Sequence, residues 1–142
     1  MGKKIFRVFT LLFAMILLSS WGNQGHTMIS FRINLSFNEE MSLFNDWIFY
    51  LSEHASDADN RKRNDPEEGP RHYIDIDNYP GFQESGVIPH SLEDCISAYG
   101  AGFVEDNGTL PWATLAMYDS VVSYMRREDW TGAKKYAADL GH

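Results

Sequence analysis

Apolar residues recur at three- and four-residue steps along much of this chain, which is the spacing that puts side chains on one face of an α-helix. The clearest such face consists of Met41, Phe44, Trp47, Ile48 and Leu51. Asn38 precedes this face and is predicted to cap the helix, and the two residues after Asn38 are acidic, which suits the first turn. We expect this helix to run to about Glu53 or His54.

Other segments show the same periodicity. Residues 27–35 form a helical pattern that carries His26 at its start, and Ser91 opens a helix with acids in its first turn. Thr109 is predicted to cap a fourth helix, and a fifth starts near Thr131 and is still in progress at the last residue. The predicted fold class is therefore all-α, a multi-helix domain truncated after about five helices.

One segment departs from this pattern. Residues 71–77, Arg-His-Tyr-Ile-Asp-Ile-Asp, alternate polar and apolar side chains, which predicts a short extended segment. The loop before it is rich in Pro, Gly and charge, and Tyr79-Pro80-Gly81 ends it.

Residues 1–20 are predicted to be a signal peptide. A basic start contains Lys3, Lys4 and Arg7, an apolar run covers residues 8–18, and Ser19-Ser20 supplies small residues. Leu18 stands where a small residue is preferred at the cut, so an uncleaved membrane anchor is the alternative. With cleavage, residues 21–142 form one domain of a periplasmic or secreted protein, with no stable protein partner implied.

Charge and cysteine content narrow the possible functions. Loss of the three basic residues of the signal changes the formal net charge from −8 to −11, which disfavours broad electrostatic attraction to polyanions. Bound metal cations would supply the local positive charge that a phosphate substrate needs. The lone Cys95 cannot form a disulfide within the chain, and we expect it to be a small buried residue.

Several residues have the chemistry of zinc ligands, because imidazole nitrogen and carboxylate oxygen suit zinc where thiolates are absent. The candidates are Trp21, His26, Asp57 or Asp59, His72 and His142. Trp21 is included because signal cleavage would make it the N-terminus, and a free α-amine has a pKa of only about 8. His54 and His90 are interpreted as surface or core histidines.

Four motifs occur in order along the mature chain: Trp-Gly-x-x-Gly-His at 21–26, Ala58-Asp59, His-Tyr-Ile-Asp at 72–75, and Leu-Gly-His at 140–142. In this order they resemble the superfamily of zinc-dependent phospholipases C and single-strand-specific nucleases. The first and third motifs are the specific ones. The resemblance implies an all-helical domain that holds three zinc ions and hydrolyses phosphodiesters in nucleic acids or phospholipids.

The resemblance also implies roles for individual residues. Trp21, through its amine and carbonyl, and His26 would hold one ion. Asp59, His72 and His142 would hold a second, with Asp57 as the alternative to Asp59. As the catalytic residue, Asp59 would also orient or deprotonate the attacking water.

The sequence departs from the family pattern after Gly141-His142. Family members continue with an aspartate one helical turn later, a Pro-x-His segment and a His-x-x-x-Asp pair, which complete the cluster. This chain is therefore expected to be the N-terminal part of such an enzyme and to supply only part of the ligands. A secreted helical module without catalysis is the alternative function.

Overall fold

A computed structural model describes residues 21–142, and the predicted signal peptide lies outside the described residues. Every regular element within this range is a helix, which confirms the predicted all-α class. The prediction of about five helices was too low, because the range is divided into more and shorter helices. Between residues 21 and 142, no helix is both long enough and apolar enough to cross a bilayer.

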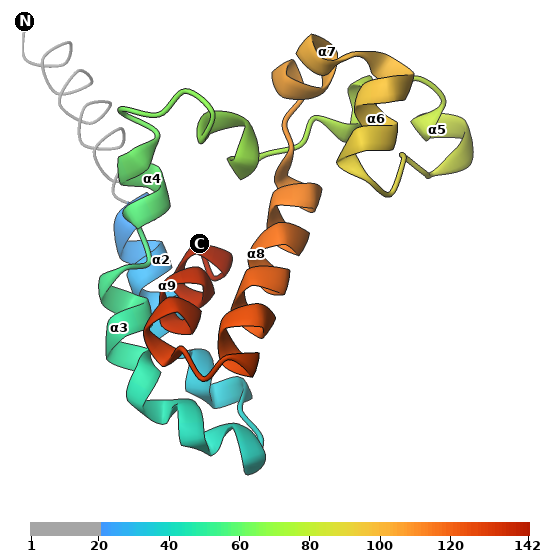
Figure 1. Cartoon of the computed structure of the whole chain (residues 1–142). Coiled ribbons are helices and arrows are strands. Elements are labelled where there is room, and N and C mark those ends of the chain that lie inside the picture. Colours follow the sequence, from blue (N-terminus) through green and yellow to red (C-terminus); the bar gives the residue numbers. More distant parts are fainter. Residues whose placement is uncertain (1–20) are drawn as a thin grey trace, which may run out of the picture.

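The larger part of the molecule is a helical bundle (Figure 1). Its main helices are α2 (Trp21–Phe31), α3 (Ile48–Glu53), α8 (Leu110–Arg126) and α9 (Trp130–Leu140). Two 3-10 helices, Ile33–Ser36 and Glu40–Trp47, connect α2 to α3, and the short α4 (Asp57–Arg61) follows α3. The core of this bundle is Trp47, Leu51, Ala133 and Ala138. The two alanines leave room for α9 to lie close to its neighbours.

A smaller part lies at the other end of α8 (Figure 1). It contains α5 (Phe82–Ser85), α6 (Leu92–Tyr99) and α7 (Ala101–Asp106), preceded by the 3-10 helices Gly69–His72 and Ile76–Asn78. Its separate core consists of Tyr79, Cys95, Val104 and Trp112. Cys95 is fully buried and free, as predicted.

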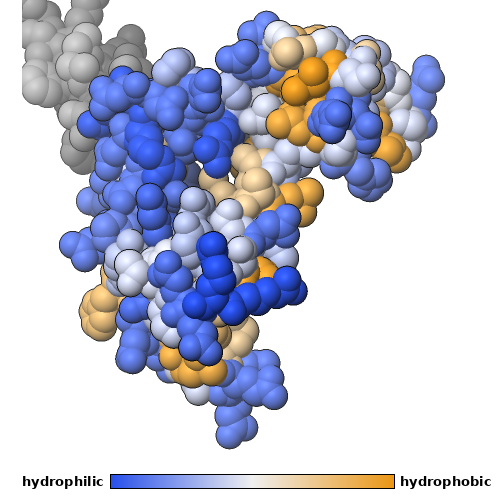
Figure 2. All heavy atoms as spheres, in the orientation of Figure 1, coloured by the Kyte–Doolittle hydropathy of each residue, from blue (hydrophilic) through white to orange (hydrophobic). Residues whose placement is uncertain are grey.

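Helix α8 connects the two parts. Trp112, near its start, belongs to the core of the smaller part, whereas Tyr124 and Met125, near its end, pack against the core of the bundle. Its 17 residues span about 25 Å. Figure 2 shows the surface narrowing between the two parts, with apolar side chains gathered on the smaller one.

The predicted helix starts are largely confirmed. The Asn38 side chain accepts a hydrogen bond from the Met41 amide at 2.9 Å, and Ser91 accepts one from the Asp94 amide at 3.0 Å. Thr109 precedes α8, but its side chain makes no capping hydrogen bond. The helix predicted over residues 38–54 is 3-10 as far as Trp47 and α-helical only from there to Glu53.

Two predictions about element boundaries were wrong. The helix predicted over residues 27–35 with His26 at its start is α2, which covers Trp21–Phe31 and has His26 in its middle, and Ile33–Ser36 is a separate 3-10 helix. Residues 71–77 are extended only around Tyr73, between two 3-10 helices. Residues 21–142 contain no β-strand with which a longer extended segment could pair.

The segment around Tyr73 is instead tied to the start of α8. Leu110 donates its backbone N–H to the Tyr73 carbonyl at 3.2 Å, Thr109 donates to the Pro70 carbonyl at 2.6 Å, and Asp75 donates to the Asn107 carbonyl at 2.8 Å. These bonds fix the backbone on either side of His72.

Gly108 lies at the closest point of this contact. Its φ is +86°, and a Cβ there would collide with the Tyr73 carbonyl and ring. We expect Gly108→Ala to lower the free energy of unfolding by about 2–5 kcal/mol through strain and overpacking, as measured by urea denaturation. Gly86→Ala is the control, because φ is +68° there but nothing lies within 4 Å. An equal loss in both variants would show that the contact with Tyr73 is unimportant.

Candidate metal centre

Three predicted ligands from separate segments meet at one point. Asp59 lies in α4, His72 ends a 3-10 helix and His142 follows α9. His72 Nδ1 is 3.1 Å from His142 Nε2, and Asp59 Oδ1 is 3.8 Å from the first nitrogen and 3.6 Å from the second. Donor atoms around a tetrahedral zinc ion are about 3.3 Å apart, given bonds of 2.0–2.1 Å. The three atoms are therefore spaced as zinc ligands are.

His26 reaches the same cluster from α2. Its Nε2 lies 4.0 Å from Asp59 Oδ2, and its ring centroid lies 4.1 Å from that of His142. Donor atoms of His26, Asp59 and His142 all lie within 4.8 Å of one another. One carboxylate oxygen of Asp59 thus faces His72 and His142, and the other faces His26.

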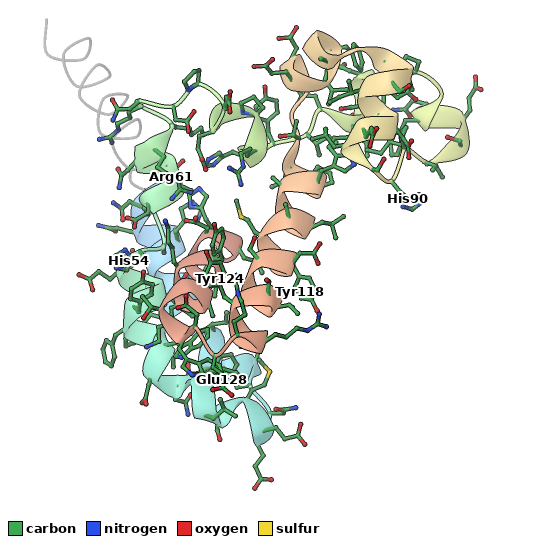
Figure 3. All side chains as sticks on the ribbon, viewed as in Figure 1. His54, Arg61, His90, Tyr118, Tyr124 and Glu128 are labelled. Atoms are coloured by element: carbon green, nitrogen blue, oxygen red, sulfur yellow. The ribbon has the colours of Figure 1, made fainter. Side chains whose placement is uncertain are left out.

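The structure separates the two candidate aspartates. Asp57 Oδ2 is hydrogen-bonded to His54 Nδ1 at 2.7 Å, and none of its ion pairs in the described residues involves His26, His72 or His142. Asp59 and not Asp57 therefore lies among the histidines. Figure 3 shows His54 beside α3 and His90 in the smaller part of the molecule, and neither belongs to the cluster.

Trp21 is the first residue of α2. Five residues at the helical rise separate its backbone from that of His26 by about 7.5 Å along the helix axis. The structure thus brings four of the five predicted metal-binding residues together, and a shared ion for Trp21 and His26 stays a prediction.

Hydrogen bonding sets the tautomer of His142. Its Nδ1 lies 2.8 Å from the carbonyl oxygen of Ala55. A carbonyl only accepts, so Nδ1 carries the proton and Nε2 of the neutral ring presents a lone pair. A backbone carbonyl in this position is a common partner of a metal-binding histidine.

A neutral His72 ring cannot satisfy both of its nitrogens within the described residues. Its Nε2 is buried without a hydrogen-bond partner, and Glu68 Oε1 lies 3.5 Å away. With the proton on Nδ1, the lone pair of His72 Nε2 would face the Glu68 carboxylate. With the proton on Nε2, the lone pair of His72 Nδ1 would face the lone pair of His142 Nε2 at 3.1 Å. A cation between these nitrogens removes the second conflict, so the donor set fits a metal ion.

The surroundings of His72 and His26 lower the pKa of both rings. Burial lowers the pKa of His72, and the charges of Lys62 and His142 lower it further, against the attraction of Asp59 and Glu68. Burial, together with His142, also lowers the pKa of His26, against the attraction of Asp59. Neutral imidazole is the metal-binding species, so both rings suit coordination near neutral pH.

The cluster opens into a cleft of about 330 Å³. Helix α8 supplies one wall through Leu110, Ala113, Thr114 and Met117. Lys62 and Arg71 also line the cleft, and Lys62 Nζ lies 3.6 Å from Asp59 Oδ1. Arg71 Nη1 lies 3.8 Å from Glu68 Oε2, so both of these cations are paired with carboxylates that also line the cleft. Asp139 lines it too, and an anionic ligand would therefore need the charge of a bound cation.

Sequence reasoning missed the residues that support the cluster. Glu68 and Asp139 are buried carboxylates, and Arg61 bridges them. The four-residue spacing of Glu68 and His72 was an available signal for one of these contacts. The partnership of Arg61 with Asp139 joins residues 78 positions apart, which no local pattern reveals.

Comparison of this chain with protein-family models, curated proteins and solved structures finds no match. The case for a function therefore depends on the geometry of the cluster and on the motifs.

Proposed function

We propose that this chain belongs to an exported zinc-dependent phosphodiester hydrolase of the phospholipase C and single-strand-specific nuclease type. The observation that supports this most is the convergence of Asp59, His72 and His142, from three distant segments, with donor atoms 3.1–3.8 Å apart. The unsatisfied His72 ring gives independent support, because a metal ion resolves its conflict.

In this proposal Asp59, His72 and His142 hold one zinc ion, and His26 holds another together with Trp21. Zinc in such a site polarises phosphoryl oxygens and lowers the pKa of bound water. The Asp59 side chain is 40% exposed to solvent, so its carboxylate can accept a hydrogen bond from the attacking water and orient it. Bound zinc would supply the positive charge that attracts the phosphate, because Lys62 and Arg71 are each paired with a carboxylate.

The test is zinc binding and hydrolysis by the exported, mature protein. We expect zinc to co-purify with it, and EDTA to remove the metal and to lower the melting temperature, because binding to the folded state adds to its stability. Hydrolysis of a single-stranded oligonucleotide and of phosphatidylcholine vesicles is then measured with and without restored zinc. The two substrates distinguish nuclease from phospholipase activity.

Zinc-dependent cleavage of either substrate supports the proposal. Zinc binding without cleavage of either would favour the non-catalytic secreted module, which keeps the ligands as a structural centre. A purified protein that neither contains nor takes up zinc would refute the metal site and the hydrolase together.

A further inference from the structure

We infer that Arg61 is a positioning residue, which keeps the three ligand-bearing segments of the proposed zinc site in register by bridging Glu68 and Asp139. This inference rests on the proposed function, because it concerns how the same site is held together. It adds residues that no motif of the family resemblance includes.

The guanidinium of Arg61 uses all three of its nitrogens. Nε and Nη2 donate to the two oxygens of Glu68 at 3.3 and 3.2 Å, and Nη1 donates to Asp139 Oδ1 at 3.1 Å. This fork on Glu68 is the bidentate arrangement that fixes direction as well as distance. Figure 3 shows Arg61 at α4, above the end of α9.

Each member of this triad is a near neighbour of a proposed zinc ligand. Arg61 follows Asp59 by two residues, Glu68 precedes His72 by four, and Asp139 precedes His142 by three. Glu68 also faces the buried Nε2 of His72 at 3.5 Å. The triad therefore links α4, the 3-10 helix at residues 69–72 and the end of α9, which are the segments that carry the ligands.

Glu68 and Asp139 depend on Arg61 because their carboxylates are shielded from water. The side chains of Glu68 and Asp139 are only 3% and 10% exposed, and a buried carboxylate needs a charged partner. Arg71 is the other cation near Glu68, at 3.8 Å, and it does not bridge to Asp139 among the described ion pairs. Removing Arg61 would leave Asp139 without a cation and free these segments to move apart.

The bridge requires an arginine. A lysine ammonium is a single point charge on a flexible stem and lacks the planar fork that engages two carboxylates at once. Arg61→Lys should therefore keep the charge and lose most of the positioning.

The test compares zinc affinity in Arg61→Met, Arg61→Lys and the control Arg63→Met, in the mature chain. Arg63 is two residues away and exposed, and it has no ion pair among residues 21–142. Affinity is measured by competition with a chromogenic chelator, and the helix content and urea midpoint of the metal-free proteins are recorded. We expect both Arg61 variants to lose about 10–100-fold in affinity, the range for residues that orient ligands, and Arg63→Met to match the wild type.

A spectroscopic signature separates positioning from general stability. Cobalt replaces zinc in such sites and reports their geometry in its visible absorption, so the Arg61 variants should show an altered cobalt spectrum at saturating metal while Arg63→Met does not. If Arg61→Met does not fold, Asp139→Asn breaks one arm of the bridge only and is judged by the same measurements.

The outcomes distinguish this inference from the proposed function. Wild-type zinc affinity and an unchanged cobalt spectrum in the folded Arg61 variants would overturn the role of Arg61 and leave the zinc site standing. A wild-type chain that binds no zinc would overturn both. Weaker binding with an altered spectrum, confined to the Arg61 and Asp139 variants, establishes the positioning role.

Discussion

Asp59→Asn is expected to lower the zinc affinity of the folded chain by at least about a hundredfold, since even residues that only orient ligands contribute about 10–100-fold. Both oxygens of this carboxylate face donor atoms of the cluster: Oδ1 lies 3.6 Å from His142 Nε2, and Oδ2 lies 4.0 Å from His26 Nε2. Asparagine keeps the shape of the side chain but removes the negative charge that offsets a divalent cation. Loss of that charge therefore weakens binding of the metal ion by the site as a whole.

Asp57→Asn is the matched control, because it makes the same chemical change two residues away. Asp57 is hydrogen-bonded to His54, so we expect its replacement to leave zinc affinity unchanged. Both variants are titrated with zinc against a chromogenic chelator, and their helix content is compared. A larger loss in Asp57→Asn than in Asp59→Asn would transfer the ligand role to Asp57.

The same pair of variants tests catalysis wherever the wild type hydrolyses a phosphodiester. Asp59→Asn should remove turnover even at saturating zinc, because the group that orients the attacking water is lost. Near-normal turnover in that variant would refute the catalytic role of Asp59. Its role as a ligand would still be judged by the zinc affinity.

The helices were predictable because their apolar faces and caps are local. Asn38, Ser91 and the periodic residues behind them signal helix starts within a few positions. The 3-10 geometry over Glu40–Trp47 was not predictable, since 3-10 and α-helices share the same sequence preferences over such short lengths. The length of the extended segment was overestimated because its backbone conformation depends on hydrogen bonds with residues 107–110, which are distant in sequence.

The site was predictable only in part, for a similar reason. Residue chemistry and motif order singled out His26, Asp59, His72 and His142, and the fold brings these four together. Spacing alone could not choose between Asp57 and Asp59, because the choice depends on which face of α4 turns toward α2 and α9. The Arg61 bridge depends on burial of Glu68 and Asp139, which is a property of the folded chain.

Trp21 carries the second large prediction: activation of the site by export. While residues 1–20 are attached, the nitrogen of Trp21 is a peptide amide without an available lone pair. Cleavage of the predicted signal peptide would turn it into an α-amine with a pKa of about 8, which is neutral in an appreciable fraction of molecules near neutral pH and can bind a metal. His26 already lies against His142 and Asp59, so an ion bound by the amine and His26 would lie beside the proposed zinc site.

We therefore expect a protein that begins at Trp21 to hold about one more zinc ion per chain than a protein with one extra glycine before Trp21. Zinc is counted by elemental analysis after gel filtration, at equal helix content. Trp21→Phe is the control, because it changes the side chain and keeps the terminal amine and carbonyl, and its zinc content should match that of the protein beginning at Trp21. Equal zinc content with and without the extra glycine would show that the terminal amine is not a ligand. A loss of zinc in Trp21→Phe alone would assign the role of Trp21 to packing of its indole rather than to coordination by its backbone.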